Sequence, residues 1–152
     1  MPYIFAFIFG LLASFGALLV ELFYTSFTVS TPSLALGATP FAPGIFDLLV
    51  LALIEETSKI IFFFRSAYFN RSPYNTLLFA LIFGTGFASL EYFAVSFLSL
   101  PISGPMIGIL IIHIITSILL IFALKESFDK KRILFVLAII TLIHFGYNLF
   151  LY

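Results

Sequence analysis

Five runs of about 20 mostly apolar residues dominate this sequence, and each is long enough to cross a lipid bilayer as an α-helix. They cover residues 3–24, 45–65, 74–98, 106–124 and 133–152. Only 9% of the residues are charged, whereas soluble domains carry about 25%. The chain therefore lacks the polar residues that a water-facing surface needs. We expect an all-α, polytopic bundle of five transmembrane helices.

The segments between these runs contain the residues that usually interrupt helices, namely Pro, Gly and clustered polar residues. These segments are residues 25–44, 65–73, 100–105 and 125–132. They show no composition shift that would mark a separate soluble domain. We therefore predict a single integral membrane domain over residues 1–152, with its recognisable motifs within residues 45–152.

The basic residues predict the orientation of this domain. All seven lie in or beside two connections: Lys59, Arg65 and Arg71 near the second, and Lys125, Lys130, Lys131 and Arg132 in the fourth. Five spans place these two connections on the same side, and the positive-inside rule makes that side cytoplasmic. The N-terminus is then expected in the cytoplasm and the C-terminus outside.

Composition also excludes several classes of protein. The chain has no Cys, which excludes a disulfide framework and thiolate chemistry. A formal net charge of zero argues against nucleic acid as a partner. Residues 1–9 contain no basic residue, so the first apolar run is expected to be a retained span rather than a signal peptide.

Ionisable residues inside the apolar runs are the candidates for function, because a charge in mid-membrane costs at least about 2.5 kcal/mol. The second run contains Glu55, Glu56 and Lys59; the others contribute Glu91, His113, Thr116, Ser117, His144 and Asn148. With a helical rise of about 1.5 Å per residue, we place these groups at one depth, at or slightly outside the midplane. A shared depth on four helices predicts a site.

Helical spacing supports this interpretation, since residues four apart share a helix face. Four such pairs occur: Glu55 with Lys59, Phe87 with Glu91, His113 with Ser117, and His144 with Asn148. A simpler interpretation is structural, with interhelical hydrogen bonds and a Glu55–Lys59 ion pair. Glu21 and Asp47 are expected near water, as interfacial or capping residues.

Two kinds of chemistry fit these residue types, and both hydrolyse amides. A buried Glu can serve as the general base for water, while His and Asn stabilise an oxyanion. Alternatively, two His and one Glu can hold Zn²⁺ and leave a position for water. The chain has no Cys, no convincing activated Ser, no intramembrane Asp pair and no HExxH motif, which removes the other common peptidase mechanisms.

The ordered motifs EExxK, FxxxE, an intramembrane His with Ser four residues later, and HxxxN resemble the PrsW family. These are bacterial and archaeal intramembrane proteases, in a superfamily with the CAAX prenyl endopeptidases of the ABI type and the Aph subunit of gamma-secretase. The resemblance covers about residues 50–150. EExxK and FxxxE, in place of EExxxR and FxxxH, favour the PrsW side over the CAAX side.

The resemblance implies a role for each motif residue. Glu55 would activate water, Glu56 would position the site, and His144 with Asn148 would stabilise the oxyanion. Glu91 would bind metal or share the role of the base. The metal ligands it implies are His113, His144 and Glu91, with supporting roles for Lys59, Phe87 and Ser117. Both a zinc-dependent and a metal-free glutamate mechanism stay open.

The resemblance also implies a multi-pass protein of a bacterial or archaeal plasma membrane, acting on a membrane-anchored protein or peptide. The depth of the site predicts cleavage in the outer half of the substrate's span. A second hypothesis is a non-catalytic scaffold or binding subunit, as in the Aph branch. A third, an ion or proton transporter, would string charged groups along the membrane normal, and the common depth argues against it. Substrate and oligomeric state stay open.

Overall fold

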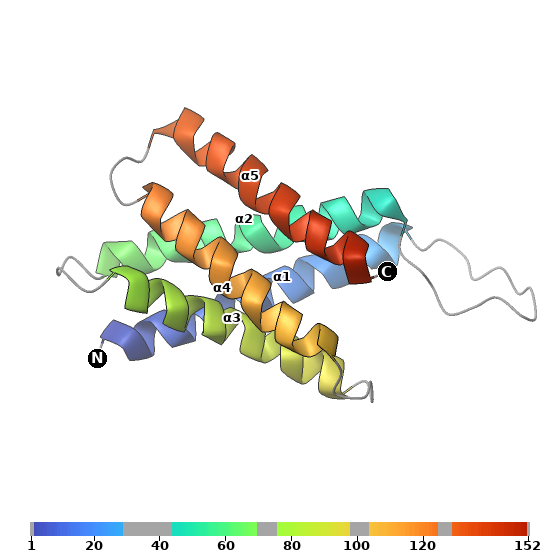
Figure 1. Cartoon of the computed structure of the whole chain (residues 1–152), viewed down its shortest axis with the longest axis horizontal. Helices are drawn as coiled ribbons and strands as arrows, with labels where there is room; N and C mark the ends of the chain where they lie inside the picture. Colours follow the sequence, from blue (N-terminus) through green and yellow to red (C-terminus); the bar gives the residue numbers. More distant parts are fainter. Residues whose placement is uncertain (1, 29–43, 70–75, 98–103, 125–128, 152) are drawn as a thin grey trace, which may run out of the picture.

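The structure, a computed structural model, describes residues 2–28, 44–69, 76–97, 104–124 and 129–151. These residues form five α-helices and no strand: α1 Pro2–Thr28, α2 Ile45–Phe69, α3 Thr76–Phe97, α4 Gly104–Leu124 and α5 Lys130–Leu151. The predicted all-α class and the five helices are confirmed. Successive helices run in opposite directions, so that α1 begins at one end of the bundle and α5 ends at the other (Figure 1).

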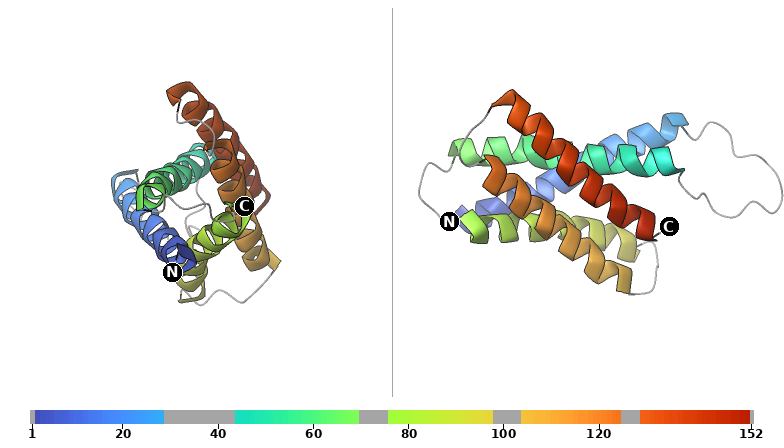
Figure 2. Two further views of the ribbon diagram at one scale, coloured as in Figure 1. Left: turned by 90° about the vertical axis from the view of Figure 1, so that its left-hand side faces the viewer. Right: turned by 45° about the horizontal axis from the view of Figure 1, so that its top comes forward.

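The helices form a closed ring in which each packs against two neighbours. Helix α1 contacts α2 and α3, α3 contacts α4, α4 contacts α5, and α5 returns to α2. A smaller contact joins α2 to α4 across the ring. The view along the bundle in Figure 2 shows this arrangement around one centre. Side chains that point inwards from different helices therefore meet one another.

Large apolar side chains cover the outside of the ring on every helix. Exposed examples are Phe5, Leu22, Ile61, Phe93, Ile107, Phe135 and Phe150. Three helical segments are long and apolar enough to cross a membrane, namely Pro2–Thr28, Thr76–Ala94 and Lys130–Phe150, and Ile107–Ala123 is a shorter apolar helix. Lipid is the solvent that suits such a surface. Helix α2 is long enough, but it carries the charged residues of the site.

The helices extend further than the apolar runs predict. Helix α1 continues to Thr28 and α2 to Phe69, while α5 already begins at Lys130. The prediction that residues 125–132 and 65–73 are loops throughout is therefore wrong at Lys130–Arg132 and at residues 65–69. Polar residues at a helix end can stay helical, because their side chains reach the membrane surface. Residues 70–73 and 125–128 of these two segments lie outside the described residues.

Glycines let three helices approach closely. A Cβ added to Gly84 would lie 2.9 Å from the backbone carbonyl oxygen of His113 on α4. One added to Gly10 or Gly86 would collide with the backbone of the facing helix, α3 for Gly10 and α1 for Gly86. Small residues at such crossings are the usual device of membrane helices. The resulting contacts bring α3 and α4 together where they carry Glu91 and His113.

Hydrogen bonds between described residues connect α1 to α2. Ser58 Oγ donates to the carbonyl oxygen of Ala13 at 2.6 Å, and the Tyr24 hydroxyl donates to Asp47 Oδ1 at 2.8 Å. The second oxygen of Asp47 accepts the backbone N–H of Gly44 at 2.9 Å, which caps the start of α2 as a capping box does. The expected capping role of Asp47 is confirmed.

Candidate metal centre

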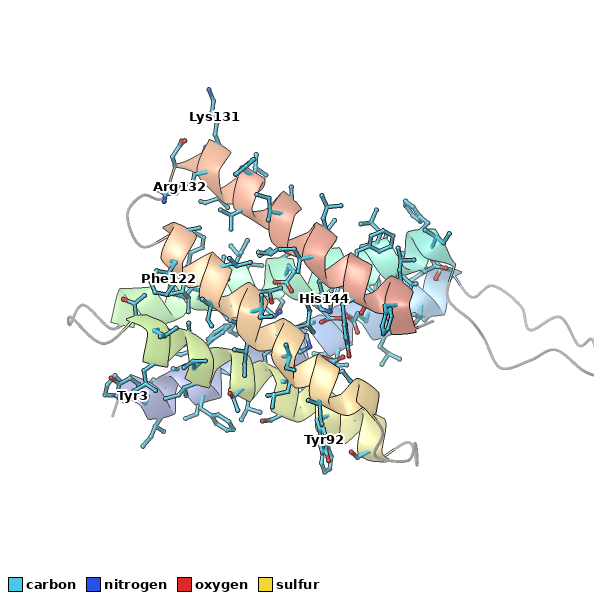
Figure 3. All side chains as sticks on the ribbon, in the orientation of Figure 1. Tyr3, Tyr92, Phe122, Lys131, Arg132 and His144 are labelled. Atoms are coloured by element: carbon cyan, nitrogen blue, oxygen red, sulfur yellow. The ribbon has the colours of Figure 1, made fainter. Side chains whose placement is uncertain are left out.

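Ionisable side chains from the five helices meet at the centre of the ring. In Figure 3, His144 lies on α5 well away from Lys131 and Arg132, which mark the end of the bundle where α5 begins. His113 on α4 is fully buried, and its ring packs edge-on against that of His144 with 5.1 Å between ring centroids. Of the polar residues that the sequence places at one depth, Glu55, Glu56, Lys59, Glu91, His113, Thr116 and His144 contact one another in one cluster.

This cluster contains a buried ion pair. Lys59 Nζ donates to Glu56 Oε1 at 2.7 Å, and neither side chain is exposed. Lys59 also donates to Thr116 Oγ1 at 2.8 Å and lies 4.6 Å from the ring centroid of Phe87, a cation–π distance. The sequence prediction that Lys59 pairs with Glu55 is wrong. The i, i+3 residue Glu56 takes the ammonium group, which leaves Glu55 free to face elsewhere.

Glu56 also sets the orientation of His144. The Nδ1 atom of His144 lies 2.8 Å from Glu56 Oε1. An ionised carboxylate can only accept hydrogen bonds, so we assign the proton of the imidazole to Nδ1. The lone pair of Nε2 then points away from Glu56. Hydrogen bonding of one His nitrogen to a carboxylate is typical of imidazoles that bind metal through the other nitrogen.

Glu55 faces both imidazoles. Its Oε2 atom lies 3.6 Å from His144 Nε2 and 3.8 Å from His113 Nε2. This oxygen is buried and has no hydrogen-bond partner in the described parts of the chain. A buried carboxylate oxygen without a partner is costly, which indicates that a cation or a water completes this position.

The arrangement of these three residues fits a divalent metal ion. One ligand atom from each of Glu55, His113 and His144 lies within 4.8 Å of the other two. Ligands of a tetrahedral zinc ion lie about 3.3 Å apart, given bond lengths of about 2.0–2.1 Å, which is close to the two Glu55 distances. Two His and one Glu form a known catalytic zinc set with one open position. The residues present can therefore hold a metal.

Glu91 contacts this group from α3. Its Oε2 atom is hydrogen-bonded to His113 Nε2, and the ring of Phe87, one turn earlier, packs on that of His113 at 4.6 Å between centroids. The Glu91 side chain is 25% exposed, against 12% for Glu55 and 3% or less for the two His. Among these four residues, Glu91 is thus the least buried.

The structure assigns a packing position to Ser117 and a peripheral one to Asn148. Ser117 is fully buried, and its Oγ would lie 3.1 Å from a Cβ built on Gly84, so it packs against α3. Thr116 points into the cluster instead. The spacing of residues along α4 could not predict its contact with Lys59. Asn148 lies one turn beyond His144 and is partly exposed.

Glu21 is the residue of the cluster that the sequence analysis missed. It is partly buried, with one carboxyl oxygen fully enclosed, and its carboxyl group lies close enough to those of Glu55 and Glu91 to interact with them electrostatically. The expectation that Glu21 is an interfacial or capping residue is therefore wrong. Glu21 lies near the end of an apolar run, and this position predicted that its side chain reaches water. The position of a residue along one helix does not show how that helix crosses its neighbours.

Comparison with known proteins identifies a family. The sequence matches the family model described as PrsW family intramembrane metalloprotease over residues 2–120. This range includes α1, which the motifs left out, and ends before α5 with His144 and Asn148. A search of curated proteins and a search of solved structures found no match.

Proposed function

Because the chain belongs to the PrsW family of intramembrane metalloproteases, we propose that it hydrolyses a peptide bond in or near a transmembrane segment of a membrane-anchored protein or peptide. The observation that carries this proposal is the buried group of Glu55, His113 and His144, whose ligand atoms converge within 4.8 Å. A scaffold has no need for a carboxylate oxygen and two imidazoles that converge on one point.

In this proposal Glu55, His113 and His144 hold the metal, for which zinc is the first candidate, and His113 Nε2 would bind the metal in place of its hydrogen bond to Glu91. A metal bound there would supply Lewis acidity to a water molecule and to the carbonyl group of the substrate. Glu55 therefore replaces Glu91 in the ligand set that the resemblance implied. Glu56 keeps His144 in the tautomer that leaves Nε2 available, and Lys59 compensates the buried charge of Glu56.

Glu91 is then the residue that removes a proton from the attacking water. It is hydrogen-bonded to His113, and its side chain is 25% exposed, against 12% for Glu55. A positioned carboxylate base contributes typically about 10²–10⁴-fold to a rate. Asn148, one turn from His144 on the same helix, would donate a hydrogen bond to the developing oxyanion.

The same proposal places the protein in the membrane. We propose five spans, with the N-terminus in the cytoplasm and the C-terminus outside, in the cell membrane of a bacterium or archaeon. Arg65 and the basic start of α5, residues 130–132, belong to the end of the bundle at which α1 begins (Figures 1 and 3), as the positive-inside rule requires of a cytoplasmic face. Glu21 and Glu91 lie towards the other end, which favours cleavage in the outer half of a substrate.

The test is cleavage of a single-span peptide by the full-length protein in liposomes, with mass spectrometry of the products. Glu55→Gln should lose both metal and cleavage. Glu91→Gln should lose cleavage by about 10²-fold or more and keep the metal. Both variants should unfold at the wild-type temperature, since Gln has the shape of Glu. A folded wild-type protein that binds no metal and cleaves no substrate would favour the non-catalytic alternative, and products cut near the cytoplasmic end would contradict the orientation.

A further inference from the structure

A groove runs between α1 and α2 on the outside of the ring of helices. Its volume is about 400 Å³, and both helices line it: Gly16, Ala17 and Val20 from α1, and residues within 53–62 from α2. Among the described residues of this lining, only Thr57 and Ser58 are polar. Val20 and Leu53 are 51% and 43% exposed, so the groove opens to the surroundings of the bundle rather than to its centre.

A second hollow continues this groove along α2. Its described lining is Ile61, Phe62, Phe64 and Arg65, and its volume is about 480 Å³. Ile61 and Phe62 belong to both linings, so the two hollows adjoin on one face of α2. Arg65 is exposed and places a guanidinium group at the end of this face. The combined groove is therefore apolar over most of its length and positively charged at one end.

The length of the combined groove matches the thickness of one leaflet of a bilayer. Leu53 and Arg65 are twelve residues apart on α2, which corresponds to about 18 Å at the helical rise. Half of the hydrocarbon core of a bilayer measures about 15 Å. Arg65 belongs to the end of the bundle that is cytoplasmic in the proposed topology, so the groove extends from the inner headgroup region to about the midplane.

A phospholipid fits this distribution of charge better than another protein chain does. A guanidinium group binds phosphate through two parallel hydrogen bonds, and basic pockets on the cytoplasmic side of membrane proteins bind anionic headgroups. A second copy of the chain would have the same orientation in the membrane. On a two-fold axis it would bring its own Arg65 to the same depth, and like charges that face each other across an interface are unfavourable.

We propose that the combined groove of α1 and α2 is a binding site for an anionic phospholipid of the inner leaflet. The phosphate of the lipid binds Arg65, and one acyl chain lies along Ile61 and Leu53 of α2 towards Val20 of α1. The site lies on the outside of the ring, and it goes beyond the proposed function, since it requires neither metal nor catalysis.

The experiment is native mass spectrometry of the full-length protein in detergent. The protein is titrated with dioleoylphosphatidylglycerol, which is anionic, or with dioleoylphosphatidylcholine, which is zwitterionic and has the same acyl chains. Arg65→Gln removes the charge of the groove, and Arg65→Lys keeps it. Lys131→Gln is the matched control, because Lys131 is an exposed basic residue at the same end of the bundle and lies on another helix, α5 (Figure 3).

The path of the acyl chain is tested at the other end of the groove. Val20→Phe places an aromatic side chain where the acyl chain would end. Leu19→Phe is its control, because Leu19 is 52% exposed on the same helix and is not among the described lining residues. Thermal unfolding of each variant reports the fold.

We expect the wild-type protein to bind the anionic lipid more tightly than the zwitterionic one. Arg65→Gln should weaken binding of the anionic lipid about 5-fold, the usual effect of one basic residue at an anionic membrane surface, and should spare the zwitterionic lipid. Arg65→Lys should keep most of the preference, and Lys131→Gln should match wild type. Val20→Phe should weaken binding of both lipids, and Leu19→Phe should weaken neither.

Equal affinities of the wild-type protein for the two lipids would overturn the proposal. Equal losses in Arg65→Gln and Lys131→Gln would do so too, because the charge would then act through the membrane surface as a whole. Equal effects of Val20→Phe and Leu19→Phe would contradict the path of the acyl chain. A lipid-free dimer of the wild-type protein that Val20→Phe dissociates would assign the groove to a second copy of the chain instead.

Discussion

The Nδ1–H group of His144 donates to Glu56 Oε1 at 2.8 Å, and this bond joins α5 to α2 at the centre of the ring. The same oxygen accepts from Lys59 at 2.7 Å. Glu56 therefore connects a metal-facing imidazole to a buried ammonium group. Helix α5 lies outside the range of the family match, and this hydrogen bond is one of the contacts that secure it to the family's core.

Removing either member of the Glu56–Lys59 pair should destabilise the fold. Lys59→Met leaves a buried carboxylate without its cation, which costs about 3–5 kcal/mol in buried pairs. The double variant Glu56→Gln with Lys59→Met should recover part of that loss, because no charge is then unpaired. Unfolding in detergent mixtures measures the stability of the single and the double variant. Lys131→Met, at the exposed start of α5, is the control. A double variant no more stable than Lys59→Met would contradict the ion-pair account.

Asn148→Ala should affect the reaction and spare the fold. The side chain is partly exposed, and no hydrogen bond joins it to the other described residues, so its removal should leave the unfolding temperature unchanged. Loss of an oxyanion donor lowers kcat by about 10²–10³-fold. Kinetics on a peptide substrate would show this, with metal content unchanged. Wild-type kcat in the variant would remove Asn148 from the mechanism.

Two glycine substitutions should have opposite effects. In Gly10→Ala the new methyl group meets the backbone of α3 at Phe83, which no side-chain rotation relieves, so we expect a loss of about 1–3 kcal/mol from overpacking. In Gly146→Ala nothing lies within 4 Å of the new Cβ, so the higher helix propensity of Ala should leave stability equal or up to about 1 kcal/mol higher. Equal unfolding temperatures in the two variants would show that α1 and α3 do not pack this closely.

The helices and the common depth of the cluster could be predicted from the sequence because both depend on local features. Run length defines a helix, and position within the run defines depth. The pairing of side chains could not be predicted. Both Glu55 and Glu56 lie within reach of Lys59 along α2, and the choice between them depends on Thr116 and His144 from two other helices.

The same limit explains the other differences. Thr116 and Ser117 are adjacent in the sequence, and the rotation of α4 decides which of them faces the cluster; the close contact of α4 with Gly84 sets that rotation. Glu21 joins the site because α1 crosses α2 at an angle (Figure 1), and the hydrophobic pattern of α1 contains no information on that angle.

The proposed topology can be tested cleanly because the chain has no native Cys. In a Lys131→Cys variant, the Cys at the start of α5 should react with a membrane-impermeant maleimide only when the reagent has access to the cytoplasmic face of the membrane. Ile45, at the start of α2, is largely exposed. In an Ile45→Cys variant, the Cys should react with the same reagent in intact cells. Labelling of both positions from the same side would contradict five spans with a cytoplasmic N-terminus.

The most direct test of the proposed centre is elemental analysis of the purified protein and of four variants. We predict about one zinc or other transition-metal ion per wild-type chain, little or none in Glu55→Gln, His113→Ala and His144→Ala, and wild-type content in Glu91→Gln. Thermal unfolding of each sample would show that the fold persists. A folded wild-type protein without metal, or a Glu55→Gln variant with full metal content, would contradict the account.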